Sequence, residues 1–183
     1  MKKIIIAIDS FKGCLTSAEA GKAAEKGIKS INPSCHTSVI PIADGGEGLL
    51  DVLITATKGK YITLSAHGPL MKMAKTHYGL SGNGRTAIIE MAAISGLPLV
   101  PIEQRNPMLT TTFGTGELIK DALNKGCRNF IIGIGGSATN DAGLGMLQAL
   151  GFRFLDKSGH TLGTGGQIME AVANIDTLSL IHI

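Results

Sequence analysis

Residues 130–146 have the sequence FIIGIGGSATNDAGLGM, the most informative stretch of the chain. Phe130 to Ile132 form an apolar run typical of a strand, and mostly glycine and small polar residues follow it. A helical pattern of apolar residues then runs through Met146 and ends before Gly151, a position at which glycine commonly ends a helix. The stretch therefore predicts a strand, a glycine-rich turn and a helix in direct succession.

The glycine-rich turn, residues 133–143, is a candidate anion site. At a helix N-terminus the backbone N–H groups are unpaired and the helix dipole is positive, so phosphate or carboxylate is favoured there. Hydroxyl and amide side chains in the turn add hydrogen-bond donors, and the carboxylate after them suits a cation, a hydroxyl or a helix cap. The residues that we expect to bind nucleotide phosphate are Gly135, Gly136, Ser137, Thr139, Asn140 and Asp141.

Two other interpretations fit the same turn. Residues 133–138, GIGGSA, satisfy the G-x-G-x-x-G/A pattern of dinucleotide-binding folds, and Asp156 ends the next strand where such folds place a ribose ligand. On this pattern alone the protein would be an NAD-dependent oxidoreductase. Alternatively, the glycines serve only to let the strand and the helix pack closely. A P-loop is excluded as a motif, because the sequence contains no G-x-x-x-x-G-K-[ST].

The composition favours an α/β protein with buried strands. Charged residues are only 17% of the chain and the mean hydropathy is positive, as expected when strands are covered on both faces. A net charge of +3 without a basic run argues against nucleic acid as a partner. The N-terminal apolar run stops at Asp9 and is too short for a signal peptide or a membrane span. The three cysteines are widely spaced without a metal-binding pattern, which favours a cytoplasmic location.

Apolar periodicity predicts alternating strands and helices in the first 60 residues. Thr16-Ser-Ala-Glu19 is a capping-box sequence, so a helix should begin there and end at Pro33. Between residues 61 and 89, short strands separated by Gly68-Pro69 and by residues 81–84 predict antiparallel hairpins. The other predicted elements are strands at 3–8, 36–42 and 152–155, and helices that open at Asp44 and Thr115.

Polar residues gather in loops that follow predicted strands, and α/β proteins bind ligands beyond the C-terminal ends of strands. Several of these side chains also have structural interpretations. Asp44 and Thr115 suit helix N-caps, and Lys12 suits an ordinary solvated lysine. His67 and His77 have no ligand partner nearby in the sequence, so we expect surface or packing roles for them. The loops are residues 9–13, 43–48, 110–117 and 133–143.

Five motifs occur in the order in which they are found in bacterial glycerate kinases. They are IDSFKGCLTSAEA, PIADGGEG, TAIIEMAAISGLPLVP, RNPMLTTTFGTGELIKDAL and IIGIGGSATNDAGLGMLQALG. Over residues 1–176 the chain resembles the kinases of the glycolate and glucarate pathways, which phosphorylate D-glycerate with ATP. The resemblance implies an α/β fold of the two-lobed glycerate kinase type, with the active site in the cleft.

The resemblance also implies a division of the chain. Residues 1–60 would be the first segment of a Rossmann-like α/β lobe. Residues 61–177 would be an incomplete second α/β lobe, with an antiparallel hairpin section and the anion loop 133–143. Members of the family are much longer, so we expect the chain to be an N-terminal fragment that is inactive by itself. Leu178–Ile183 matches the translation of a transposase adapter used in sequencing libraries, and we expect it to be a non-native tail.

The implied reaction is in-line phosphoryl transfer, which needs positioning and charge neutralisation. We expect ATP and Mg²⁺ as cofactors, with Asp141 holding Mg²⁺ through water. Lys12 would neutralise charge, and Asp44 would orient or deprotonate the acceptor hydroxyl, with Asp9 as the second choice for that role. The expected contacts of D-glycerate are Gly45, Gly46, Glu47 and Thr115. A non-catalytic sensor of small acids or nucleotides is the remaining alternative.

Overall fold

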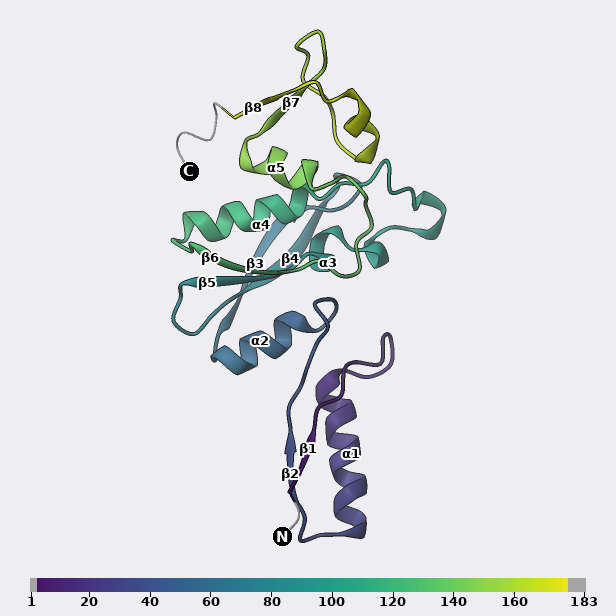
Figure 1. The fold of residues 1–183 in the computed structure, drawn as a ribbon, viewed down its shortest axis with the longest axis vertical. Helices are drawn as coiled ribbons and strands as arrows, with labels where there is room; N and C mark the ends of the chain where they lie inside the picture. The colour runs from purple at the N-terminus through teal and green to yellow at the C-terminus, as the bar shows by residue number, and fades with distance from the viewer. Residues whose placement is uncertain (1–2, 178–183) are drawn as a thin grey trace.

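The computed structural model describes residues 3–177 (Figure 1). Met1, Lys2 and the predicted non-native tail at 178–183 lie outside the described residues. A two-stranded parallel sheet forms one end of the molecule, a four-stranded mixed sheet the middle and a two-stranded antiparallel sheet the other end. The predicted α/β class with an antiparallel hairpin section is confirmed.

The N-terminal sheet is a parallel strand pair joined by a helix. The helix begins at the predicted capping box: the Thr16 hydroxyl accepts a hydrogen bond from the Glu19 N–H at 3.2 Å, and the Glu19 carboxylate accepts one from the Thr16 N–H at 2.9 Å. It ends at Ile31 with Asn32 as its C-cap, just before the proline that the sequence marks as its limit. The elements are β1 (Lys3–Ile6), α1 (Ser17–Ile31) and β2 (His36–Val39).

The middle sheet has the strand order β3-β4-β5-β6. Both hairpins are antiparallel, and their turns lie at Gly68-Pro69 and at residues 81–84, as predicted. The last pair, β5 and β6, is parallel, because a helix crosses over between the two strands. The strands are β3 (Lys60–His67), β4 (Met73–Leu80), β5 (Thr86–Glu90) and β6 (Asn129–Gly133).

Helices cover both faces of the middle sheet (Figure 1). Successive residues of β5 point to opposite faces, which explains its continuous apolar sequence. Ala87 and Ile89 belong to the core beneath α4 (Phe113–Asn124), whereas Ile88 packs against α2 (Leu49–Thr57). Although α2 falls in the predicted first segment, it contacts β4 and β5. The division at residue 60 stays a prediction.

The C-terminal part of the described chain packs through α5, which lies against α4. Short helical turns connect β5 to α4, and an antiparallel strand pair follows α5. None of the helices within residues 3–177 has the length and apolar character needed to cross a bilayer. The remaining elements are α3 (Ala92–Ser95), η1 (Leu97–Leu99), η2 (Ile102–Gln104), α5 (Leu144–Leu150), β7 (Arg153–Leu155), η3 (Gly166–Ala171) and β8 (Asn174–Asp176).

Two local expectations about helix starts are wrong, whereas the succession of strand, glycine-rich turn and helix is confirmed, because α5 begins at Leu144, directly after the turn 133–143. The N-cap of α2 is Gly48, in the left-handed conformation, and not Asp44. Thr115 lies inside α4, whose N-cap is Thr112. The end of α5 agrees with expectation, since Gly151 is left-handed with φ 109°.

Candidate active site

Loops that follow strands β1, β2, β5 and β6 meet at one region of the molecule. Glu90 and Gly133, the last residues of the parallel strands β5 and β6, are paired in register. Ser17 joins the loops after β1 and β2, because its buried hydroxyl donates to the Ile8 carbonyl at 2.6 Å and accepts from the Ile42 N–H at 2.9 Å. This is the position at which α/β proteins bind ligands.

Two glycine-rich loops are in direct contact there. The Gly135 N–H donates to the Gly45 carbonyl at 3.1 Å. A Cβ on Gly135 would lie 2.7 Å from the Gly46 Cα, and one on Gly133 would lie 2.6 Å from the Gly45 carbonyl oxygen. A side chain at either position would therefore overlap the backbone of the other loop. Close packing accounts for these glycines by itself, and phosphate binding by the loop stays a prediction.

A cleft of about 580 Å³ opens between the loop after β1 and the start of α2. Of the predicted site residues, Lys12 and Glu47 line it, and both side chains are exposed. Asp9 and Asp44 are outside its lining; the Oδ1 atom of each is bonded to a nearby backbone N–H, that of Ser10 at 2.7 Å and that of Gly46 at 3.0 Å. Residues 133–141 are also outside it. The predicted site residues thus form two neighbouring groups.

Glu90 lines the same cleft and was not among the predicted site residues. It is half-buried, and its Oε2 accepts a hydrogen bond from the Leu50 N–H at 3.3 Å. Burial raises the pKa of the Glu90 carboxyl; the Leu50 and Gly48 N–H groups oppose this rise, and the negative charges of Asp51 and Glu47 add to it. The available sequence signal was a charged residue directly after the apolar run of β5.

Asp141 is buried at the point where the N-termini of α4 and α5 meet. It is 1% exposed, and its Oδ2 accepts from the Thr112 N–H at 2.8 Å and the Gly145 N–H at 3.2 Å. Its Oδ1 accepts from the Gly143 N–H at 3.0 Å, and the Thr112 hydroxyl donates to both oxygens. The carboxylate therefore occupies the positive ends of both helices as an internal anion. Its oxygens face hydrogen-bond donors, a surrounding that does not fit a Mg²⁺ ligand.

The hydroxyl groups of the glycine-rich loop bond within the protein. The Ser137 Oγ donates to the Thr139 carbonyl at 2.9 Å and accepts from the Thr139 N–H at 3.1 Å. The Thr139 Oγ1 donates to the Thr110 carbonyl at 2.6 Å. The Asn140 backbone N–H donates to the Pro107 carbonyl at 3.2 Å, and this residue is exposed. These contacts fix the shape of the loop.

Thr115 is also directed into the protein. It is 2% exposed, and its hydroxyl lies 2.9 Å from the hydroxyl of Ser95 in α3. Among the predicted contacts of glycerate, Thr115 and Gly46 are buried in this structure. The hydroxyl pair joins α4 to the short helix that follows β5, and so it supports the end of the strand that carries Glu90.

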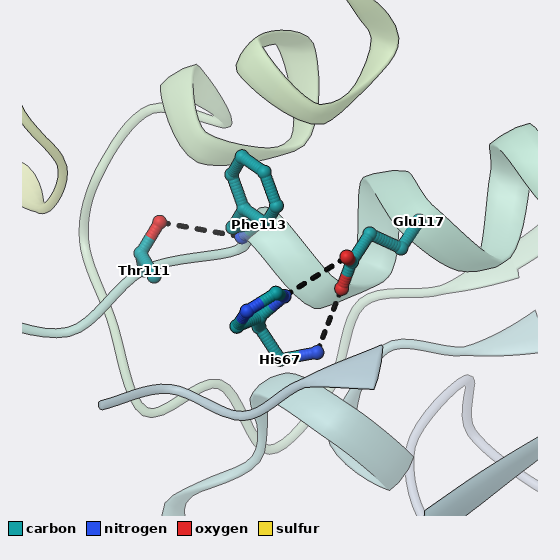
Figure 2. A network of polar contacts seen from close by, with 4 residues as sticks. All are labelled: His67, Thr111, Phe113 and Glu117. Atoms are coloured by element: carbon teal, nitrogen blue, oxygen red, sulfur yellow. Dashed lines mark hydrogen bonds and ion pairs between the residues drawn. The ribbon is translucent and has the colours of Figure 1, made fainter. Parts of the chain in front are cut away.

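His67 has a partner that lies 50 residues away in the sequence (Figure 2). The Glu117 carboxylate accepts from the His67 backbone N–H at 2.7 Å and lies 2.9 Å from its ring Nδ1. Phe113 packs edge-on against the ring, with the centroids 5.5 Å apart. The Phe113 N–H in turn donates to the Thr111 hydroxyl at 3.2 Å. The network fastens the end of β3 to the first turns of α4, in agreement with a packing role.

The geometry does not support the dinucleotide-binding alternative. That arrangement needs a helix directly after the G-x-G-x-x-G/A motif, here residues 133–138, and a next strand that continues the sheet. Here α5 starts at Leu144 and its N-terminus is filled by Asp141, while β7 pairs with β8 and not with β6. The Asp156 carboxylate closes a local turn by accepting from the Ser158 and His160 N–H groups. Within residues 3–177, no group of three His, Cys, Asp or Glu side chains is arranged to hold a metal ion.

Known proteins agree with the resemblance in sequence and in fold. Glycerate kinase from Bacillus subtilis is 53% identical over 178 residues, which cover 97% of this chain and 47% of the relative. Glycerate 2-kinase from Escherichia coli is 49% identical, with the same coverage of 97% and 47%. A crystal structure from Salmonella typhimurium LT2, assigned as glycerate kinase 2, matches with a TM-score of 0.84 and 48% identity, covering 98% of this chain and 48% of that one.

The chain spans about half the length of the curated relatives it matches. Within that half the agreement is nearly continuous, since a profile of the glycerate kinase family matches residues 4–182. The five motifs noted in the sequence all fall inside the matched range. This chain is therefore a member of the glycerate kinase family.

Proposed function

We propose that the protein encoded by the complete gene transfers the γ-phosphoryl group of ATP to D-glycerate. The observation that carries the proposal is the cleft at the strand ends, in which a lysine and several carboxylates face one space. A hydroxy acid and a nucleoside triphosphate are both anionic, so a cation is needed to hold them close together. The names of the relatives support the same reaction. A cytoplasmic location is part of this proposal.

The two groups of site residues have different proposed roles. Lys12 and Glu47, in the cleft, are proposed to contact glycerate. Asp44, with Asp9 as second choice, is proposed to orient the acceptor hydroxyl from the rim. The proposed nucleotide side is the glycine-rich loop 133–143, whose backbone would approach the phosphates of ATP, and Gly45 and Gly46 in the loop joined to it are proposed to contact glycerate. When bound with ATP, Mg²⁺ neutralises charge on the phosphate oxygens.

We further propose that the phosphoryl group goes to the 2-hydroxyl of D-glycerate. The E. coli relative, 49% identical, is named glycerate 2-kinase. Phosphorus NMR of the product tests this position directly. A phosphate on the secondary 2-oxygen couples to one proton and gives a doublet, whereas one on the primary 3-oxygen couples to two protons and gives a triplet. A triplet would overturn the assignment of the 2-position and leave the kinase activity intact.

A panel of ligands tests the proposed function as a whole. The protein encoded by the complete gene should show D-glycerate-dependent release of ADP from MgATP. Its melting temperature should rise with MgATP and with D-glycerate, because ligands stabilise the folded state that binds them. Stabilisation by NAD alone would support the oxidoreductase instead. Stabilisation by glycerate and ATP without any ADP release would support a non-catalytic sensor.

A further inference from the structure

Glu90 differs from the other carboxylates that line the cleft. Four carboxylate residues line it, and Glu19, Glu47 and Asp51 are exposed whereas Glu90 is half-buried. The Glu19 carboxylate is held by Thr16 in the capping box, and the Asp51 carboxylate accepts a hydrogen bond from the hydroxyl of Tyr61. Glu90 is therefore the carboxylate that the cleft shields most from water.

The position of Glu90 is fixed by the fold. It is the last residue of β5, paired with Gly133 at the start of the glycine-rich loop. The Leu50 N–H at the start of α2 holds its Oε2. The side chain thus lies between the loop proposed to approach ATP and the cleft proposed to hold glycerate. A group that acts on the hydroxyl during transfer must lie between these two places.

The surroundings of Glu90 suit proton transfer. Burial raises the pKa of its carboxyl, and a carboxylate with a raised pKa is a better general base near neutral pH. The charged and titratable groups that share the cleft come from each element around it: Lys12 and Cys14 from the loop after β1, Glu19 from α1, Glu47 from the loop before α2, Asp51 from α2, and His77 from β4.

We propose that Glu90 is the catalytic residue that accepts the proton of the glycerate hydroxyl; this inference rests on the proposed kinase function. In the step, a bond forms between the hydroxyl oxygen and the γ-phosphorus as the bond from that phosphorus to the bridging oxygen of ADP breaks. The hydroxyl proton passes to the Glu90 carboxylate, which later releases it to water. Asp44 orients the same hydroxyl without taking the proton.

The test compares three variants of the protein encoded by the complete gene. Glu90→Gln removes the base but keeps an oxygen that can accept the Leu50 hydrogen bond. Glu90→Asp keeps a carboxylate on a shorter side chain. Glu103→Gln is the matched control, because it removes one negative charge from an exposed residue of η2 outside the cleft lining. For each variant, kcat and kcat/KM are measured between pH 5 and 9, together with the melting temperature.

We expect Glu90→Gln to lower kcat by about 10²-fold or more and to abolish the fall in rate at acid pH, without lowering the melting temperature. Glu90→Asp should lose less activity and keep the acid limb, and Glu103→Gln should match the unsubstituted enzyme. A Glu90→Gln enzyme that keeps a third of its kcat, or one whose loss follows a lowered melting temperature, overturns the inference alone. An unsubstituted protein without ADP release overturns the proposed function and the inference with it.

Discussion

The backbone N–H of Gly135 donates a hydrogen bond to the carbonyl of Gly45, and this bond joins two loops that are 90 residues apart in the sequence. One loop follows β2 and the other follows β6, so the contact links the N-terminal sheet region to the middle sheet. In each loop, a Cβ added to a glycine would lie within 4 Å of the backbone of the other loop. The relative position of the two groups of site residues therefore depends on glycine at this junction.

Gly135→Ala should lower the free energy of unfolding by about 1–3 kcal/mol, because its Cβ would lie 2.7 Å from the Gly46 Cα. Urea denaturation of the protein encoded by the complete gene measures the change. Gly27→Ala is the matched control: no atom lies within 4 Å of its added Cβ, and alanine favours the helix by about 1 kcal/mol. If Gly135→Ala is as stable as the parent while Gly27→Ala shows its expected gain, the two loops are not held in contact in solution.

Asp44→Asn should lower kcat by about 10²-fold, as expected for a group that contacts the transition state. The acid limb of the pH profile should stay in place, because Glu90 and not Asp44 takes the proton. The asparagine oxygen can still accept from the Gly46 N–H, so the loop shape is kept. A loss below threefold accompanied by a lower melting temperature would give Asp44 only a role in shaping the loop, worth about 1 kcal/mol.

Asp141→Asn should be among the most destabilising single changes in the chain. The amide group would direct N–H donors toward the Thr112, Gly143 and Gly145 N–H groups, which now share a carboxylate. We expect a loss of roughly 2–4 kcal/mol of unfolding free energy, measured by urea denaturation. Asp156→Asn, in an exposed turn, is the control. Unchanged stability combined with lost ATP binding would return Asp141 to the predicted role of a ligand-binding residue.

Local sequence patterns predicted much of the backbone. The capping box of α1, both hairpin turns of the middle sheet and the glycine end of α5 were confirmed, because each depends on residues within one turn of the chain. The N-caps of α2 and α4 were predicted wrongly, because Asp44 and Thr115 have the residue types of a cap but the caps are Gly48 and Thr112. The burial of Asp141 was missed for a non-local reason: it bonds to Thr112, 29 residues earlier, and no periodic pattern indicates such a bond.

The candidate site shows the same division. Loop residues after strand ends, such as Lys12 and Glu47, were predicted and do line the cleft. The prediction of their roles rested on residue type and stays untested. Glu90 was overlooked because the sequence shows it only as the end of an apolar strand. The hydrogen bond that holds its side chain comes from the N–H of Leu50, which is 40 residues away. Likewise, His67 has no partner near it in the sequence and pairs with Glu117 only through the packing of α4 on β3.

The stability of the protein should depend on pH through Glu90. Because its pKa is raised in the folded state, the folded protein holds the proton more tightly than the unfolded chain. The resulting stabilisation is present below the ordinary pKa of glutamate and is lost as pH rises through the raised pKa. Glu90→Gln removes the group that titrates, so this variant does not lose stability as the pH rises. Its melting temperature should therefore exceed that of the parent at pH 8, with the difference shrinking toward pH 4.

Thermal unfolding at several pH values checks this expectation, with Glu103→Gln as a control that should show no such trend. A Glu90→Gln variant that melts below the parent at every pH would mean that the Leu50 contact needs a full carboxylate charge. The proton-linked difference and the kinetic acid limb come from the same carboxyl group. The stability difference and the acid limb should therefore have the same midpoint pH if bound substrate leaves the pKa of Glu90 unchanged.

The 183-residue chain by itself should not phosphorylate glycerate. Large apolar side chains on several elements face water: Ile31 on α1 is 89% exposed, and Ile134 after β6 is 78% exposed. Among the described strands, β6 pairs only with β5, so its other edge is open. Exposed apolar surface of this kind marks a place where another part of a protein packs. We expect the isolated chain to bind a hydrophobic dye, to lack a sharp melting transition and to show no glycerate-dependent release of ADP. A cooperative melt together with turnover would show instead that the cleft, Lys12 and Glu90 suffice for the reaction.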